Sequence, residues 1–240
     1  MSLYQQHRNR LLSELRHDDY GLIAPYLREV PLTRGLLLQE QEAPVEKVYF
    51  PITGVISLVS VMERGEVVET AMVGREGAVG LFGGLGPWNA FTRATVQLPG
   101  IAAVMPVASF QAAVAQSDRI RNLILRYKEA LLGQVQQTAA CNALHELEER
   151  LARWLLQALD RSDSPNLPLT QDFISQMLAV RRSTVTVIAG KLQQAGLIRY
   201  HRGQIEIVDR LKLEETACEC YRTIRRRTDA VFRTPQTALI

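Results

Sequence analysis

The chain has 240 residues, 47% of them hydrophobic and 22% charged, which is the composition of a folded protein with one large or two small domains. No uninterrupted apolar run reaches the roughly 18 residues of a membrane-spanning helix, and the polar first twenty residues lack the apolar core of a signal peptide, so we expect a cytoplasmic protein with no membrane partner. The formal net charge of +3 comes from the second half, because residues 1–145 carry 13 basic and 13 acidic side chains whereas residues 146–240 carry 15 and 12.

Residues 35–108 show the pattern of antiparallel strands. Short runs of Val, Ile and Leu, such as VYFPITGVISLVSVM, alternate with glycines and prolines. Many short strands separated by such turn residues are typical of a small barrel or jelly roll. We therefore predict an α+β protein whose first domain, residues 1–116, contains an N-terminal helix and an antiparallel β-roll.

A long helix is predicted next, at residues 117–144. The residues that form a stripe recur there at three- and four-residue steps without a proline: Ile120, Ile124, Tyr127, Leu131, Val135 and Thr138. A helix of this length exceeds the globular average of about 11 or 12 residues, so its stripe needs a partner along residues 120–142. We expect that partner to be a second copy, which makes the protein a homodimer. The alternative is a long helix that packs on its own barrel.

The third domain, residues 145–240, contains the frame of a helix-turn-helix. In LTQDFISQMLAVRRSTVTVIAGKLQQAGLIRY, Thr170 is a predicted N-cap, and Ser175 and Ala179 are small enough for two helices to cross closely. The inward positions of the frame are apolar: Ile174, Leu178, Val180, Val185 and Ile188. The segment LIRYHRGQIEIV then predicts a β-hairpin wing, so the domain is expected to be a winged helix-turn-helix.

The same segment has the charge of a DNA-binding surface, since residues 173–205 contain five basic side chains and no acidic one. Arg182 begins the second helix, where a recognition helix meets base edges in the major groove, and arginine can donate two hydrogen bonds to guanine. The candidate DNA contacts are Thr170, Arg181, Arg182, Ser183, Thr184, Thr186, Lys191, Arg199 and Arg202. The alternative is a solvated amphipathic helix with no nucleic-acid partner.

The order of these elements, with VYFPITGVISLV, VGREGAVGLFGG, ERLARWLL and LTQDFISQMLAVRRSTVTVIAGKL, resembles the Crp/Fnr family of bacterial transcription regulators. The resemblance implies a dimer with parallel central helices that binds an inverted repeat in double-stranded DNA, with RNA polymerase as a further candidate partner. It also implies that the β-roll is sensory and holds a small-molecule effector, whose binding reorients the DNA readers. By the same resemblance, the effector pocket comprises Gly77, Ala78, Gly80, Leu81, Thr92, Arg93, Val135 and Gln136.

The chain departs from the members of that family that bind cyclic nucleotides. Those members place a glutamate before a Leu-Gly-Leu turn and an Arg-Ser pair shortly after it, and Ala78 and Thr92-Arg93 occupy these places here. Val135 and Gln136 stand where the central helix of those members presents hydroxyl groups to adenine. On a strand, the shift of Arg93 by one position turns its side chain to the opposite face of the sheet. We therefore expect that cyclic AMP is not the effector.

The three cysteines, Cys141, Cys218 and Cys220, are too few and too unevenly placed for a disulfide framework, so we expect free thiols in a reducing compartment. With no cysteine before Cys141, the N-terminal iron-sulfur cluster of the family's oxygen sensors is excluded. No catalytic motif is present, and we predict a non-enzyme with no cofactor and no metal. The alternative is a redox- or metal-responsive regulator that uses Cys218 and Cys220.

Overall fold

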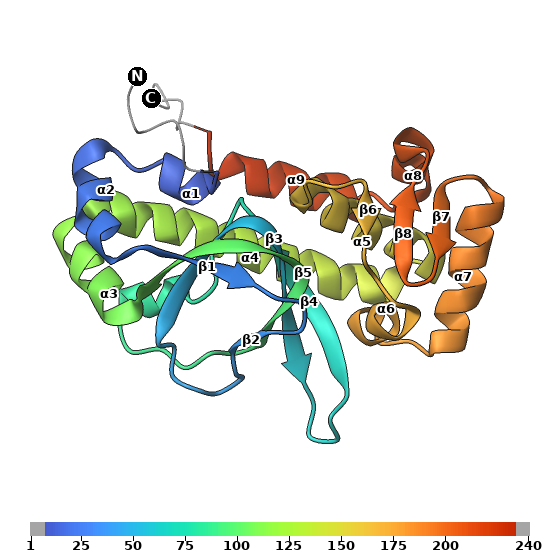
Figure 1. The fold of residues 1–240 in the computed structure, drawn as a ribbon, viewed down its shortest axis with the longest axis horizontal. Coiled ribbons are helices and arrows are strands. Elements are labelled where there is room, and N and C mark those ends of the chain that lie inside the picture. The colour runs from blue at the N-terminus through green and yellow to red at the C-terminus, as the bar shows by residue number, and fades with distance from the viewer. Residues whose placement is uncertain (1–7, 234–240) are drawn as a thin grey trace.

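The first half of the chain folds into an antiparallel β-roll, as predicted, in a computed structural model that describes residues 8–233 (Figure 1). It begins with α1 (Arg10–Ser13), α2 (His17–Ile23) and the short 3-10 helix η2 (Ala24–Tyr26). The strands are β1 (Arg28–Leu32), β2 (Leu37–Gln39), β3 (Lys47–Val61), β4 (Val67–Val73) and β5 (Arg93–Pro106). The sheet order is β1-β5-β3-β4, and β2 also pairs with β5. The 3-10 helix η3 (Leu81–Leu85) and α3 (Val107–Gln116) complete the roll.

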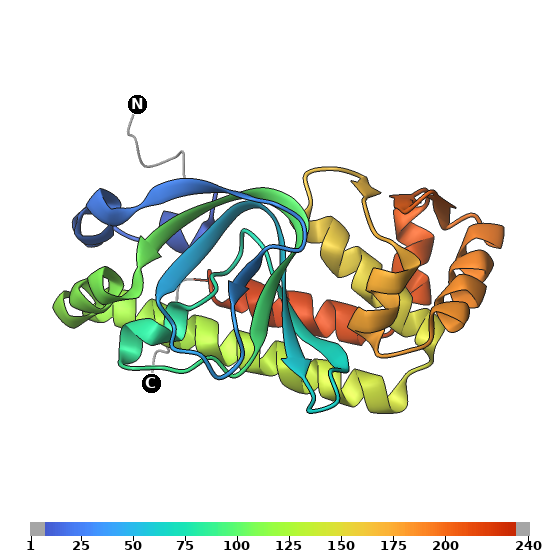
Figure 2. The ribbon, with the colours of Figure 1, turned by 60° about the horizontal axis from the view of Figure 1, so that its bottom comes forward.

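The predicted long helix is α4 (Asp118–Leu144), which has 27 residues and runs along the whole roll to the C-terminal domain (Figure 2). Ser117 caps it, because its hydroxyl oxygen accepts a hydrogen bond from the Ile120 amide at 3.2 Å. The same hydroxyl donates to Asp19 Oδ1 at 2.6 Å, which ties the start of α4 to α2.

The apolar stripe that suggested a dimer contact on α4 lies against the protein's own roll. Ile120, Ile124 and Tyr127 are buried in one cluster with the side chains of β3 and α3. Assigning this stripe to a second copy was therefore wrong, since periodicity shows that a helix face is covered but does not identify the covering element. A different face of α4 stays open within the chain, where Leu125 and Leu132 are exposed.

The second half folds as a helical domain with a small sheet. Its elements are α5 (Leu147–Arg161), β6 (Asn166–Leu167), α6 (Gln171–Leu178), α7 (Arg182–Gln194), β7 (Ile198–His201), β8 (Gln204–Ile207), α8 (Arg210–Thr216) and α9 (Cys220–Ala230). The three strands pair antiparallel in the order β6-β8-β7. Helix α9 returns alongside α4 toward the roll (Figures 1 and 2). Within residues 8–233, no helix is both long enough and apolar enough to cross a membrane.

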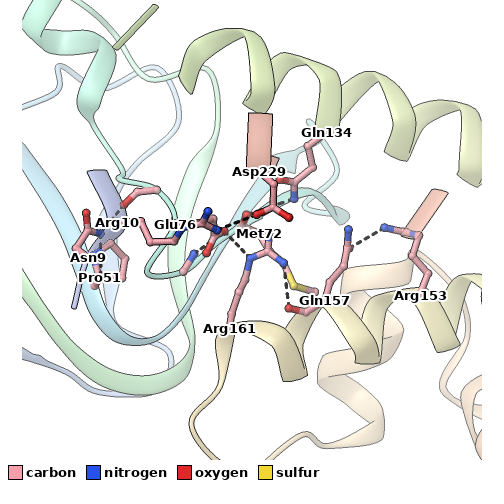
Figure 3. A network of polar contacts seen from close by, with 12 residues as sticks. Asn9, Arg10, Pro51, Met72, Glu76, Gln134, Arg153, Gln157, Arg161 and Asp229 are labelled. Atoms are coloured by element: carbon pink, nitrogen blue, oxygen red, sulfur yellow. Dashed lines mark hydrogen bonds and ion pairs between the residues drawn. The ribbon is translucent and has the colours of Figure 1, made fainter. Parts of the chain in front are cut away.

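The roll and the C-terminal domain share one core. Val55 and Met72 of the roll belong to the same apolar cluster as Leu151, Trp154 and Leu155 of α5. Polar contacts border this cluster, and Figure 3 shows them running from the roll into α5. The two halves are therefore packed together in this structure, and not joined by the chain alone.

Candidate nucleic-acid interface

The helix-turn-helix forms in the predicted register. Ile174 and Leu178 on α6 and Val185 on α7 are buried in the common core. Val180 and Ile188 are partly buried against it. These apolar side chains fix the crossing of the two helices, so the opposite side of α7 is turned toward solvent.

The turn between the helices depends on Ala179. This residue caps the end of α6 in the left-handed conformation, with φ 53° and ψ 49°, where glycine is the usual residue because it has no Cβ. Its amide donates to the Gln176 carbonyl at 3.2 Å, and the Val180 amide donates to the Ser175 carbonyl at 2.9 Å. The turn therefore has the required shape, although the left-handed conformation costs alanine about 1–2 kcal/mol of strain.

The start of α7 is an exposed basic end. Arg181, Arg182, Ser183 and Thr184 are all exposed, and the first turn contains no acidic residue. The positive end of the helix dipole points outward here, so the backbone adds to the attraction for phosphate. Arg182 Nε lies 3.4 Å from Asp172 Oδ1, but both side chains are about two-thirds exposed, so water screens this ion pair and DNA can replace it.

The other candidates on α7 differ in how firmly they are held. Thr186 Oγ1 donates to Gln171 Oε1 at 2.8 Å, which orients the hydroxyl at the surface. Lys191 Nζ lies 3.8 Å from Glu148 Oε2 in an exposed pair. Both residues follow Arg182 along the exposed side of α7.

The wing is the hairpin β7–β8. Arg202 and Gly203 both have positive φ, 48° and 76°, as the central residues of a tight hairpin turn require. Arg199 lies opposite Glu206 across the hairpin and forms an ion pair with it, so its charge is compensated within the wing. Arg202 is exposed at the tip, and the structure records no ion pair for it within residues 8–233. A Cβ on Gly203 would lie 3.3 Å from the methyl group of Thr170, so the wing tip adjoins the cap of α6.

A second candidate site is a cavity of about 450 Å³ between the roll and α4. Five of the eight predicted pocket residues line it: Ala78, Gly80, Leu81, Thr92 and Val135. The other three, Gly77, Arg93 and Gln136, lie outside its lining.

Each of these three residues has a different neighbour. The guanidinium of Arg93 donates two hydrogen bonds to Glu40, at 2.9 and 3.0 Å, and this lowers the pKa of that carboxyl. Gly77 is pressed against α4, since a Cβ there would come within 2.1 Å of the Tyr127 hydroxyl. Gln136 is exposed on α4.

The sequence did not single out the residues that give the cavity its chemistry. Phe82, Trp88 and Phe91 line it from the roll, and Lys128 lines it from α4. Lys128 Nζ lies 5.7 Å from the centre of the Trp88 ring, within range of a cation–π contact. Lys128 precedes Leu131, Leu132 and Val135 at helical spacing. The sequence could therefore have placed Lys128 in the pocket, on the same helix face as the predicted pocket residue Val135.

The exposed basic end of α7, the wing beside it and the two-helix frame define a class of protein, the DNA-binding transcription regulators with a winged helix-turn-helix. Residues 149–216 match the model of the Crp-like helix-turn-helix domain. The C-terminal domain is therefore a Crp-like helix-turn-helix domain, and the fold of the chain is similar to that of Crp/Fnr regulators.

Known proteins are similar to the chain over most of its length. The Global nitrogen regulator of Synechococcus elongatus is 23% identical over 216 residues, which are 86% of this chain and 96% of that protein. The Global nitrogen regulator of Nostoc sp. is 24% identical over 173 residues, 68% of this chain and 78% of that protein.

Solved structures show the same fold. FixK2 from Bradyrhizobium japonicum has a TM-score of 0.68 and 17% identity, over 80% of this chain and 98% of that one. A transcriptional regulator of the CRP family from Thermus thermophilus has a TM-score of 0.65 and 18% identity, over 78% of this chain and 96% of that one.

Proposed function

We propose that two copies of the chain bind an inverted repeat in double-stranded DNA, each through α7 and its wing, under the control of a small molecule in the roll cavity. The observation that carries the proposal is the exposed, acid-free start of α7 with Arg181 and Arg182, in a domain whose wing tip adjoins the cap of α6. Arg182 reads a base edge, and Arg202 contacts phosphate. In this proposal, residues 1–116 are the sensory domain, residues 117–144 are the dimerisation helix and residues 145–240 are the DNA-binding domain. The protein catalyses no reaction.

The dimer contact is the open face of α4. Leu125, Leu132 and Ala139 are exposed and follow one another at seven-residue intervals, the repeat by which two helices form a coiled coil. A parallel pair of α4 helices would cover these side chains and place the two readers on one side of the DNA, with half-sites about 10 to 10.5 base pairs apart.

Leu125→Asp is expected to convert the protein from dimer to monomer. The substitution would place two carboxylates close together at the two-fold axis, away from water and without a cation. Sedimentation at micromolar concentration measures the change. The matched control is Leu211→Asp, because Leu211 is an exposed leucine of α8, and this variant should stay dimeric. A monomeric wild-type protein, or a dimeric Leu125→Asp variant, would contradict the assigned face.

The effector is an apolar molecule with an anionic group. Aromatic and aliphatic side chains dominate the described lining of the cavity, and Lys128 is the charged residue among them. Arg93 is committed to Glu40, and Ala78 offers no acceptor to a ribose hydroxyl, which favours an effector other than cyclic AMP. Lys128, Leu131 and Val135 belong to α4, so a ligand in the cavity would bear directly on the dimer helix.

Arg182→Ala tests the DNA proposal. It is expected to cost about 1–3 kcal/mol of binding free energy on the specific site and to relax the preference at one base pair of each half-site. Arg202→Ala should instead weaken binding to all sequences alike and make the salt dependence shallower. Selection of sites from a random DNA pool, followed by titrations at several salt concentrations, measures both effects. Equal losses on every sequence for both variants would refute this division of roles.

A further inference from the structure

The three cysteines and one histidine meet where α4 ends. Cys141 lies in the last turn of α4 and His145 caps the helix, while Cys218 and Cys220 lie at the junction of α8 and α9. The four potential ligand atoms lie within 4.8 Å of one another. Cys141 Sγ is 3.5 Å from Cys218 Sγ, and Cys220 Sγ is 3.5 Å from His145 Nδ1. The sequence pointed only to the last two cysteines, because the fold and not a spacing motif brings Cys141 and His145 to them.

We propose that Cys141, His145, Cys218 and Cys220 form a binding site for one zinc ion or a similar thiophilic divalent cation. Zinc in such sites is tetrahedral, with Zn–S bonds of about 2.3 Å and Zn–N bonds of about 2.0–2.1 Å, so neighbouring ligand atoms lie about 3.5–3.8 Å apart. The two measured distances of 3.5 Å match that spacing. Four protein ligands fill the coordination shell, so the ion has a structural and not a catalytic role.

The surroundings of His145 are those of a metal ligand. Its Nε2 lies 3.2 Å from Glu219 Oε2, while its Nδ1 faces the cysteines. A carboxylate on the outer ring nitrogen fixes the proton there, which leaves the Nδ1 lone pair free for a metal. Gln137 Nε2 donates to Cys220 Sγ at 3.1 Å, a contact that stabilises a thiolate.

The charge around the cluster also suits a metal thiolate. The hydrogen bond with Cys218 lowers the pKa of Cys141 to about 5, and the charge of Arg153 contributes to this. That hydrogen bond correspondingly raises the pKa of Cys218, and burial raises the pKa of Cys220. A divalent ion binds the three sulfurs as thiolates, so metal binding releases the remaining thiol protons to water. The buried Arg153 and the half-buried Arg150 balance the negative charge that remains.

The site would join two segments that meet at the base of the C-terminal domain. Cys141 and Cys218 are 77 residues apart in the sequence, and the apolar contacts of the three cysteines form a small cluster of their own. An ion bound there ties the end of the dimer helix to the α8–α9 junction. The bound ion therefore fixes the orientation of the DNA-binding domain relative to α4.

The test uses the full-length protein prepared under reducing conditions. We expect one zinc per chain by elemental analysis, and after exchange with Co²⁺ we expect thiolate charge-transfer absorption with the intense d–d bands of a four-coordinate ion. A protein that holds no stoichiometric metal and binds none at micromolar zinc would overturn the proposal. Iron with acid-labile sulfide in place of zinc would also overturn it, as would the weak d–d bands of six-coordinate cobalt.

Variants locate the site on these residues. Glu219→Gln keeps all four ligands and is expected to weaken zinc affinity by about 10–100-fold, whereas Cys218→Ser should weaken it further. His201→Ala is the control, because His201 is an exposed histidine of the wing, and its zinc affinity should equal that of the wild type. Wild-type zinc affinity in either Glu219→Gln or Cys218→Ser would refute the site. The Glu219→Gln result answers the question even if the cysteine variant fails to fold.

Discussion

Replacing Arg161 with methionine is expected to lower the free energy of unfolding by about 3–5 kcal/mol, because Glu76 would keep a buried carboxylate without its cation. Arg161 Nε lies 2.6 Å from Glu76 Oε1, and both side chains are at most 10% exposed (Figure 3). Arg161 also donates to the Gln157 carbonyl at 3.0 Å, and Glu76 accepts from the Gly74 amide at 3.2 Å. The pair thus joins the roll to α5 at a place where little of either side chain is exposed. Urea unfolding followed by tryptophan fluorescence measures the loss.

The chain offers a matched control for this prediction. A guanidinium nitrogen of Arg75 lies 2.8 Å from Asp163 Oδ1, and that ion pair also links the two halves, but its side chains are 35% and 49% exposed. Arg75→Met should therefore cost no more than about 1 kcal/mol. The double variant Glu76→Gln with Arg161→Met should recover part of the loss, since it leaves no unpaired charge. A loss in Arg161→Met no larger than that in Arg75→Met would refute the prediction.

The sequence predicted the parts of this protein that depend on local patterns. The helix-turn-helix frame was predicted correctly because Ile174, Leu178 and Val185 repeat at the spacing that buries one side of each helix. The β-roll and the long α4 were predicted for the same reason, from alternating strands and a helical stripe. A stripe does not identify its partner, so the buried face of α4 was assigned to the wrong surface.

The contacts between the two halves could not be predicted in this way. Glu76 and Arg161 are 85 residues apart, and nothing in either local segment distinguishes this glutamate from one in water. The same holds for Lys128 in the cavity and for His145 beside the cysteines, which join their sites only because α4 packs where it does. The resemblance that placed Arg93 in the pocket could not show that Glu40 would take its guanidinium.

Glu69 is the second polar link between the roll and α5, and its environment favours the protonated carboxyl. Trp154 Nε1 donates to Glu69 Oε1 at 2.7 Å, and Glu69 Oε2 lies 2.5 Å from Ser57 Oγ. Ser57 Oγ is also 2.9 Å from Gln97 Oε1, and one hydroxyl proton cannot serve both oxygens. The Ser57 hydroxyl donates to Glu69 Oε2 when the carboxyl is ionised, whereas a protonated carboxyl is itself a donor and leaves the Ser57 proton to Gln97 Oε1. Burial raises the pKa of Glu69 to about 7, although its two hydrogen bonds and the charges of Arg153 and Arg161 act in the opposite direction.

The free energy of unfolding is therefore expected to fall as the pH rises from about 5 to 7, and Glu69→Gln should remove this fall. Because the folded pKa of about 7 lies above the ordinary value of 4.5, the folded protein holds this proton more tightly than the unfolded chain does. The stabilisation is complete below pH 4.5, and about 3 kcal/mol of it is lost once the pH has passed 7. Urea titrations between pH 5 and 8 measure the slope, with Glu63→Gln as the control because Glu63 is an exposed glutamate on the turn after β3. Equal slopes in the wild type and Glu69→Gln would show that Glu69 does not titrate in this range. If the free energy of unfolding depends on pH in the wild type but not in Glu69→Gln, ionisation of Glu69 weakens the contact between the roll and Trp154. Trp154 belongs to the core that the roll shares with the DNA-binding domain.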